Sequence, residues 1–154
     1  MIGELIELQV HAVGKACGQM TAVHLRALHD SIDQACRIPA EFWWDRKAAA
    51  HAEIFNVLAD AVSEPLVERV LSNGAGLAYD LMIAAGRAAD GMITSSRQRL
   101  LAHLSGGDSE GATLEMEKHL RVLHYMGSAS QLRGAPHICV IPRLDAPPET
   151  CGAR

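Results

Sequence analysis

Residues 100–123, LLAHLSGGDSEGATLEMEKHLRVL, contain two helical patterns separated by a pair of glycines. Gly106 and Gly107 stop the first helix, and Asp108 or Ser109 can cap the second. The buried face of the second helix has helical spacing and consists of Ala112, Met116, Leu120, Leu123 and Met126. Because a short connection joins neighbouring helices that run in opposite directions, this stretch predicts part of an antiparallel helical bundle.

Helical periodicity also covers the chain upstream of this stretch. The predicted helices are Glu4 to Gln19, Thr21 (as N-cap) to about Arg37, Ala40 to about Val62, Leu66 to about Ala89, and Thr94 to Leu104. Pro39 and Pro65 suit first turns, where a missing N–H costs nothing. Between Ser72 and Gly76, two glycines predict a kink, a break or a close approach of the backbone. The fold class is therefore all-α, an antiparallel bundle of about six helices.

Composition agrees with helices and limits the classes of function. Of the 154 residues, 49% are hydrophobic but only 4% are aromatic, so the core must consist mainly of aliphatic side chains. Fourteen Lys and Arg against eighteen Asp and Glu give a net charge of -4, which disfavours non-specific binding to nucleic acid. Apolar runs are too short to span a membrane, so no membrane partner is expected.

The chain divides into a helical domain, residues 1–130, and an irregular tail, residues 131–154. Four of the six prolines follow Gly134, and proline density of this kind prevents helix formation. The first residues carry acids where a signal peptide carries basic residues. Four widely spaced cysteines form no Cys-x-x-Cys pair, which favours a reduced thiol state and a cytoplasmic location.

Eight histidines invite a metal or enzyme interpretation, but their spacing does not support a site on one helix. His24 and His29 are five residues apart, as are His119 and His124, which places each pair about 140° apart around a helix. Any metal would need ligands from several helices. His51 and His119 are the best pair for such a site, although the pattern favours a hydrogen-bonded, partly buried histidine for either one taken alone.

Three stretches resemble the C-terminal effector-binding (FCD) domain of the fatty-acid-regulator-like branch of the GntR-family transcription regulators. The resemblance extends from Leu5 to about Met126. The family's first-helix Leu-x-Glu-Leu-Arg pattern is similar to residues 5–9, LIELQ, and its middle Asp-x-x-Phe-His pattern is similar to residues 51–66, HAEIFNVLADAVSEPL. Its final helix, Gly-Asp turn and Met-x-x-His-Leu run are similar to residues 100–108 and 116–120. The last of these patterns is the most specific.

The resemblance implies an internal site but not an intact metal centre. In the family, one aspartate and three histidines bind a divalent metal. The aspartate position falls on His51 and the first histidine position on Phe55. The second histidine position falls on Arg97, and only the last is retained, as His119. His51 and His119 are then the only remaining metal ligands, so no metal cofactor is expected. Gln9 stands where the first-helix pattern ends in arginine.

The expected function is effector sensing and dimerisation, without catalysis. A pocket lined by His51, Phe55, Arg97 and His119 would take a small-molecule effector, an acyl compound or organic acid, within a homodimer. DNA would be contacted only through a winged helix-turn-helix, which is expected to be absent from this chain. The alternative is a ligand-free helical interaction or dimerisation protein in which Arg97 fills the former metal position. A metalloenzyme that uses the histidines ranks third.

Overall fold

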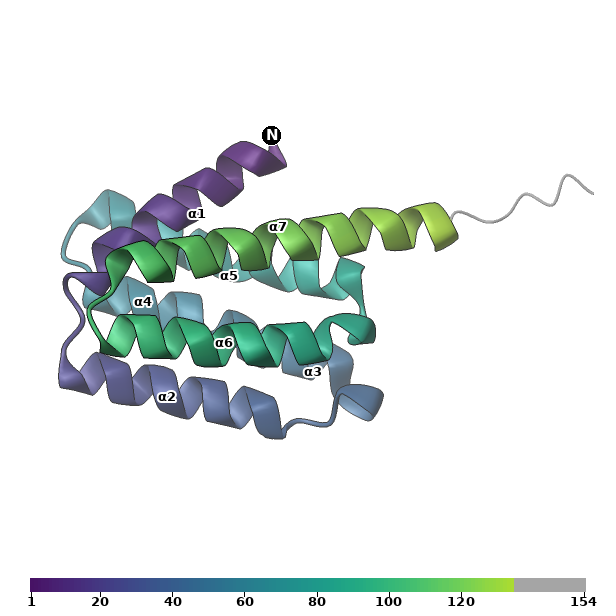
Figure 1. Ribbon diagram of the computed structural model, residues 1–154, viewed down its shortest axis with the longest axis horizontal. Helices are drawn as coiled ribbons and strands as arrows, with labels where there is room; N and C mark the ends of the chain where they lie inside the picture. The colour runs from purple at the N-terminus through teal and green to yellow at the C-terminus, as the bar shows by residue number, and fades with distance from the viewer. Residues whose placement is uncertain (135–154) are drawn as a thin grey trace, which may run out of the picture.

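The protein is a bundle of seven α-helices and one 3-10 helix in a computed structural model that describes residues 1–134 (Figure 1). The helices are α1 (Ile2–Cys17), α2 (Ala22–Arg37), α3 (Ala40–Ala52), α4 (Ile54–Ala61), α5 (Pro65–Ala85), the 3-10 helix η1 (Arg87–Ala89), α6 (Asp90–Ser105) and α7 (Ser109–Gly134). No strand occurs within residues 1–134, so the all-α prediction is confirmed. The predicted Pro-rich tail lies, from residue 135 onward, outside the described residues.

The connection between α6 and α7 agrees with the glycine pattern. Gly107 adopts a φ of 68°, which favours glycine, and so turns the chain after α6. Asp108 then accepts a hydrogen bond from the backbone N–H of Gly111 across 2.9 Å at the start of α7. The two helices lie side by side and run in opposite directions (Figure 1). Helix α7 continues to Gly134, two turns beyond the predicted buried face.

The helix predicted from Ala40 to Val62 consists instead of α3 and α4, which meet at Glu53. Around this residue two backbone N–H groups bond to the carbonyl three residues earlier, and the turn is tighter than in an α-helix. The N–H of Glu53 bonds to the carbonyl of Ala50 at 3.3 Å, and the N–H of Asn56 bonds to the carbonyl of Glu53 at 3.0 Å. Apolar spacing continues through this turn, which explains why periodicity alone predicted one helix.

Helix α5 passes through both glycines without a break. A Cβ at Gly74 would stand 2.6 Å from Cδ1 of Phe55 and even closer to the amide oxygen of Gln9. The close approach of the backbone, one of the three predicted alternatives, is therefore the one observed. The predicted end at Ala89 is wrong because Gly86, with a φ of 80°, ends α5 at Ala85.

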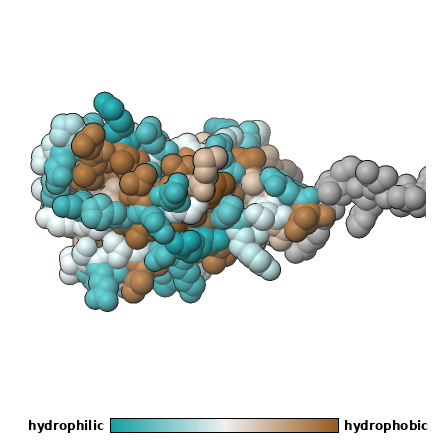
Figure 2. Space-filling model, turned by 90° about the horizontal axis from the view of Figure 1, so that it is seen from above, coloured by the Kyte–Doolittle hydropathy of each residue, from teal (hydrophilic) through white to brown (hydrophobic). Residues whose placement is uncertain are grey.

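Helices α5 and α7 form one side of the bundle together with α1, and α2 closes the other side against α3, α4 and α6 (Figure 1). Their shared interior is aliphatic, with Phe55 as its one fully buried aromatic side chain among the described residues. Figure 2 views the bundle from above and shows hydrophobic patches among hydrophilic ones. Within residues 1–134, no helix combines the length and apolar character needed to cross a bilayer.

Candidate functional site

The four residues predicted to line a pocket come from four different helices and are all buried. His51 lies at the end of α3, Phe55 in α4, Arg97 in the middle of α6 and His119 in α7. None exposes more than 1% of its surface. Arg97 is therefore not a solvated helix residue, because its side chain is fully buried in the core.

Arg97 has fewer hydrogen bonds than its charge requires. Its Nη2 donates to the carbonyl oxygen of His51 across 3.3 Å, whereas Nε and Nη1 are buried without a partner. Within residues 1–134, no carboxylate forms an ion pair with it. Burial lowers the pKa of Arg97 to about 10, so the side chain is still charged at neutral pH. An uncompensated cation in the core is costly and calls for a partner.

The two histidines add further unsatisfied groups to the cluster. Both ring nitrogens of His51 and both of His119 are buried without a hydrogen-bond partner. Burial, followed by the charges of Arg97 and Lys47, lowers the pKa of His51 to about 3. Burial, followed by Arg97 and His51, lowers the pKa of His119 well below its ordinary value. Each imidazole is consequently neutral at physiological pH and offers one donor and one acceptor.

Carboxylates that lie near the cluster are already engaged by other cations. Asp90 forms an ion pair with the ammonium of Lys47 at 3.0 Å. Glu115 accepts a hydrogen bond from Nε of Arg99 at 3.1 Å and forms an ion pair with its Nη2 at 3.0 Å. Lys47 is itself buried, one helical turn before His51, and was missed by sequence analysis. The sequence signal for the burial of Lys47 was its position on the same face of α3 as His51. The interior is therefore locally positive, with Arg97 as its unpaired charge.

A cluster with this charge suits an anion better than a metal cation. The charge of Arg97, which acts on both histidines, repels a divalent ion, whereas its free N–H groups attract oxygen anions. Among residues 1–134, no three His, Cys, Asp or Glu side chains converge in a manner that would hold a metal. The residues present fit a carboxylate, with two arginine N–H groups and the histidine N–H groups as donors.

Gln9 extends this polar interior toward α1. Its Nε2 donates to the carbonyl of Val70 across 2.6 Å, and its Oε1 is buried without a partner. Both Gln9 and Phe55 pack closely against the backbone of α5 at Gly74. Gln9 therefore places an unused acceptor beside the apolar ring of Phe55.

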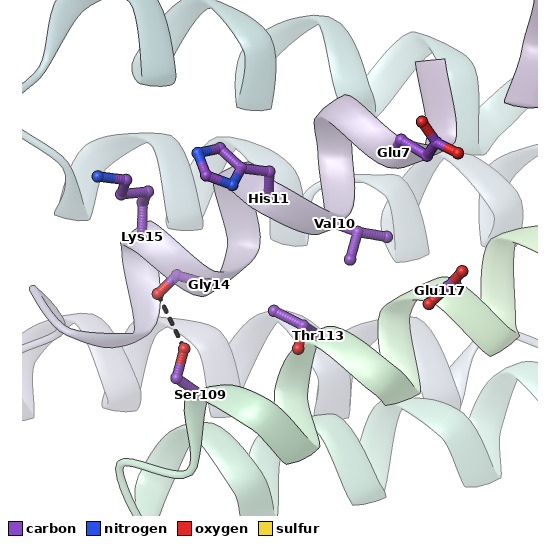
Figure 3. A pocket seen from close by; sticks show the side chains of 8 residues that line it. All are labelled: Glu7, Val10, His11, Gly14, Lys15, Ser109, Thr113 and Glu117. Carbon is purple, nitrogen blue, oxygen red and sulfur yellow. Dashed lines mark hydrogen bonds between the residues drawn. The ribbon is translucent and has the colours of Figure 1, made fainter. Parts of the chain in front are cut away.

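A pocket of about 560 Å³ lies between α1 and the first half of α7 (Figure 3). Figure 3 shows His11 and Lys15 at one end and Glu7 and Glu117 at the other. The hydroxyl of Ser109, on α7, donates to the carbonyl of Gly14 across 3.2 Å and ties the two helices together. None of the four predicted residues lines this groove, and its charged side chains face solvent.

Comparisons with family models, curated proteins and solved structures give no match to this chain. The class that the geometry itself defines is an all-α bundle with a buried, cationic polar cluster. Its resemblance to effector-binding domains rests on the sequence patterns described above.

Proposed function

We propose that this chain is a sensing domain that binds a small organic acid in its interior, in the manner of the effector-binding domain of a GntR-type transcription regulator. The observation that carries the proposal is Arg97, a fully buried cation with two unpartnered N–H groups. A carboxylate bound there would supply the missing charge and accept hydrogen bonds from the arginine and the histidines. The proposed role is binding, without catalysis.

The surroundings of the cluster favour an acid with an apolar part. Phe55 provides an aromatic wall, and aliphatic core side chains such as Met116 and Leu120 neighbour His119 along α7. An acyl chain would pack against these groups while the acid group meets Arg97. Short fatty acids and related organic acids therefore match the site, because they offer an acid group to Arg97 and an apolar chain to the surrounding side chains.

Binding at this position can be coupled to a change of shape. The four residues belong to α3, α4, α6 and α7, so a ligand held by all of them would favour one relative arrangement of these helices. In a homodimer, such a shift would alter the relation between the two subunits. In a complete regulator, this relation sets the spacing of the DNA-binding domains.

Thermal unfolding with a panel of monocarboxylates and dicarboxylates tests the proposal. A member present at 100 times its Kd should stabilise the chain by about 2.7 kcal/mol, with saturation as its concentration rises. Sedimentation with and without that ligand then tests the coupling to dimerisation. A panel in which no compound raises the melting temperature would contradict sensing of organic acids.

A closed interaction protein is the second candidate, because Met1 and the first turns of α1 expose apolar side chains. Met1, Leu5 and Leu8 expose 98%, 47% and 52% of their surfaces on successive turns. Such a stripe is typical of a helix that packs against another surface. Replacement of Leu5 and Leu8 by glutamate should dissociate a dimer in sedimentation if the stripe forms its interface.

A further inference from the structure

A small pocket lies on the side of the bundle between α2 and α6. Its volume is about 140 Å³, and residues from α2 and α6 line it: His29, Ile32, Asp33, Cys36, Gln98 and Leu101. Gln98 follows Arg97 in α6, and Leu101 lies one turn further along the same side. The pocket therefore opens onto the segment of α6 that carries the buried guanidinium.

Cys36 lines this pocket and also lies near the buried cluster. Its side chain lines the pocket and is half-buried, whereas its carbonyl oxygen accepts a hydrogen bond from Lys47 at 3.4 Å. The thiol is also close enough to Arg97 to oppose, as a weaker effect, the lowering of its pKa by burial. The small side chain of Cys36 therefore belongs both to the pocket and to the surroundings of Arg97.

Charges at the mouth of the pocket do not exclude an anion. Asp33 is paired with Arg37 across 2.8 Å, and His29 lies 3.4 Å from Asp30 on the exposed side of α2. The permanent charge behind the mouth is that of Arg97. An approaching carboxylate would therefore be attracted toward a positive interior.

We propose that a short-chain carboxylate enters between α2 and α6, passes Cys36 and binds Arg97, so that Cys36 is the residue at the entrance. This inference rests on the proposed function and adds to it the route and the ligand class, a monocarboxylate with a flexible alkyl chain. The acid group accepts from one of the two unpartnered N–H groups of Arg97, Nε or Nη1. The chain trails toward Phe55 and Cys36.

The test uses 6,6,6-trifluorohexanoate as the probe and follows its exchange between free and bound states by fluorine NMR on the full chain. Phenylalanine at position 36 should fill the entrance, whereas alanine should leave it open. We expect Cys36→Phe to have an association rate constant at least about tenfold below that of Cys36→Ala, because entry then requires the helices to separate. Arg97→Met should lose saturable binding, and trifluorohexanol, the neutral analogue, should not bind.

The possible results distinguish the proposed entry route past Cys36 from the proposed sensing function. Equal association rate constants in the two Cys36 variants, with binding that depends on Arg97, would overturn the entrance and leave sensing intact. Binding that persists in a folded Arg97→Met chain would overturn the assignment of Arg97. If the wild-type chain does not bind trifluorohexanoate, the inference is wrong, and the wider acid panel then decides the proposed function independently.

Discussion

Arg97 donates one hydrogen bond to the backbone carbonyl of His51, 3.3 Å away, and keeps two further N–H groups buried without a partner. The neutral imidazole of His51 cannot compensate the positive charge. Without a ligand, this arrangement lowers the stability of the folded chain, because a buried charge without a counterion loses its hydration. Binding sites commonly contain groups that lower the stability of the folded protein when no ligand is bound.

Replacement of Arg97 by methionine should raise the stability of the ligand-free chain. Methionine fills a similar volume with apolar groups, and replacement of buried charges by apolar side chains contributes about 1–4 kcal/mol in favourable cases. Urea unfolding measures the change in the free energy of unfolding. A large loss of stability in Arg97→Met would show that the guanidinium is satisfied by other means, such as buried water.

The matched control is Arg99→Met in the same helix. Arg99 is about half exposed and forms two bonds to the buried carboxylate of Glu115. Its removal leaves that carboxylate unpaired, which should cost about 1–3 kcal/mol. The two arginines, two positions apart, are therefore expected to change stability in opposite directions.

Acid should destabilise the fold well before the carboxylates are protonated. The pKa of His51 is lowered to about 3, and that of His119 is also well below its ordinary value of 6.5. On acidification, the two histidines therefore bind protons in the unfolded chain at pH values where they remain neutral in the folded chain. Stability is therefore complete above pH 6.5 and falls as the pH drops toward 4. Each histidine should contribute a slope of about 1.4 kcal/mol per pH unit in this range.

Urea unfolding at pH 7.5, 6 and 5 measures this slope. His119→Phe should remove the contribution of one buried histidine and flatten the profile. His29→Phe serves as the control, because the side chain of His29 is 63% exposed and lies outside the buried cluster. Equal stability of the wild-type chain at pH 7.5 and pH 5 would contradict the neutral, buried state of both imidazoles.

The N-cap of α2 provides a third prediction. Thr21 accepts a hydrogen bond from the backbone N–H of His24 at 3.4 Å, and the ring of His24 accepts one from the N–H of Thr21 at 3.1 Å. Thr21→Ala removes the first bond and should cost about 1 kcal/mol. Thermal unfolding should show that Thr21→Ser, which retains the hydroxyl, loses much less stability than Thr21→Ala. Equal losses would mean that the hydroxyl makes no contribution.

Local signals were sufficient to predict most of the fold. The glycine pair after α6 and the cap at Thr21 act within a few residues, so they are visible in the sequence. The junction at Glu53 was missed because no glycine or proline marks it, and only a change in hydrogen-bond spacing separates α3 from α4. Tertiary packing determines such a junction, and periodicity does not report it.

The site was only partly predictable for a related reason. Spacing and resemblance selected His51, Phe55, Arg97 and His119, and all four are buried. The ion pair of Lys47 with Asp90 and the orphan oxygen of Gln9 could not be anticipated, because each depends on contacts between distant helices. A lysine inside a helical pattern is normally assigned to the solvent face.

Two glycines of α5 give the final prediction. A methyl group at Gly74 would collide with the Gln9 amide and the Phe55 ring, so Gly74→Ala should force α1 and α5 apart and cost about 1–3 kcal/mol. Gly76 has no neighbouring atom within 4 Å of the corresponding position. Gly76→Ala should therefore stabilise the helix by up to about 1 kcal/mol. Chemical unfolding of both variants checks the contrast. Similar stabilisation by the two alanines would contradict the close contact at Gly74, and with it the position of Gln9 beside Phe55.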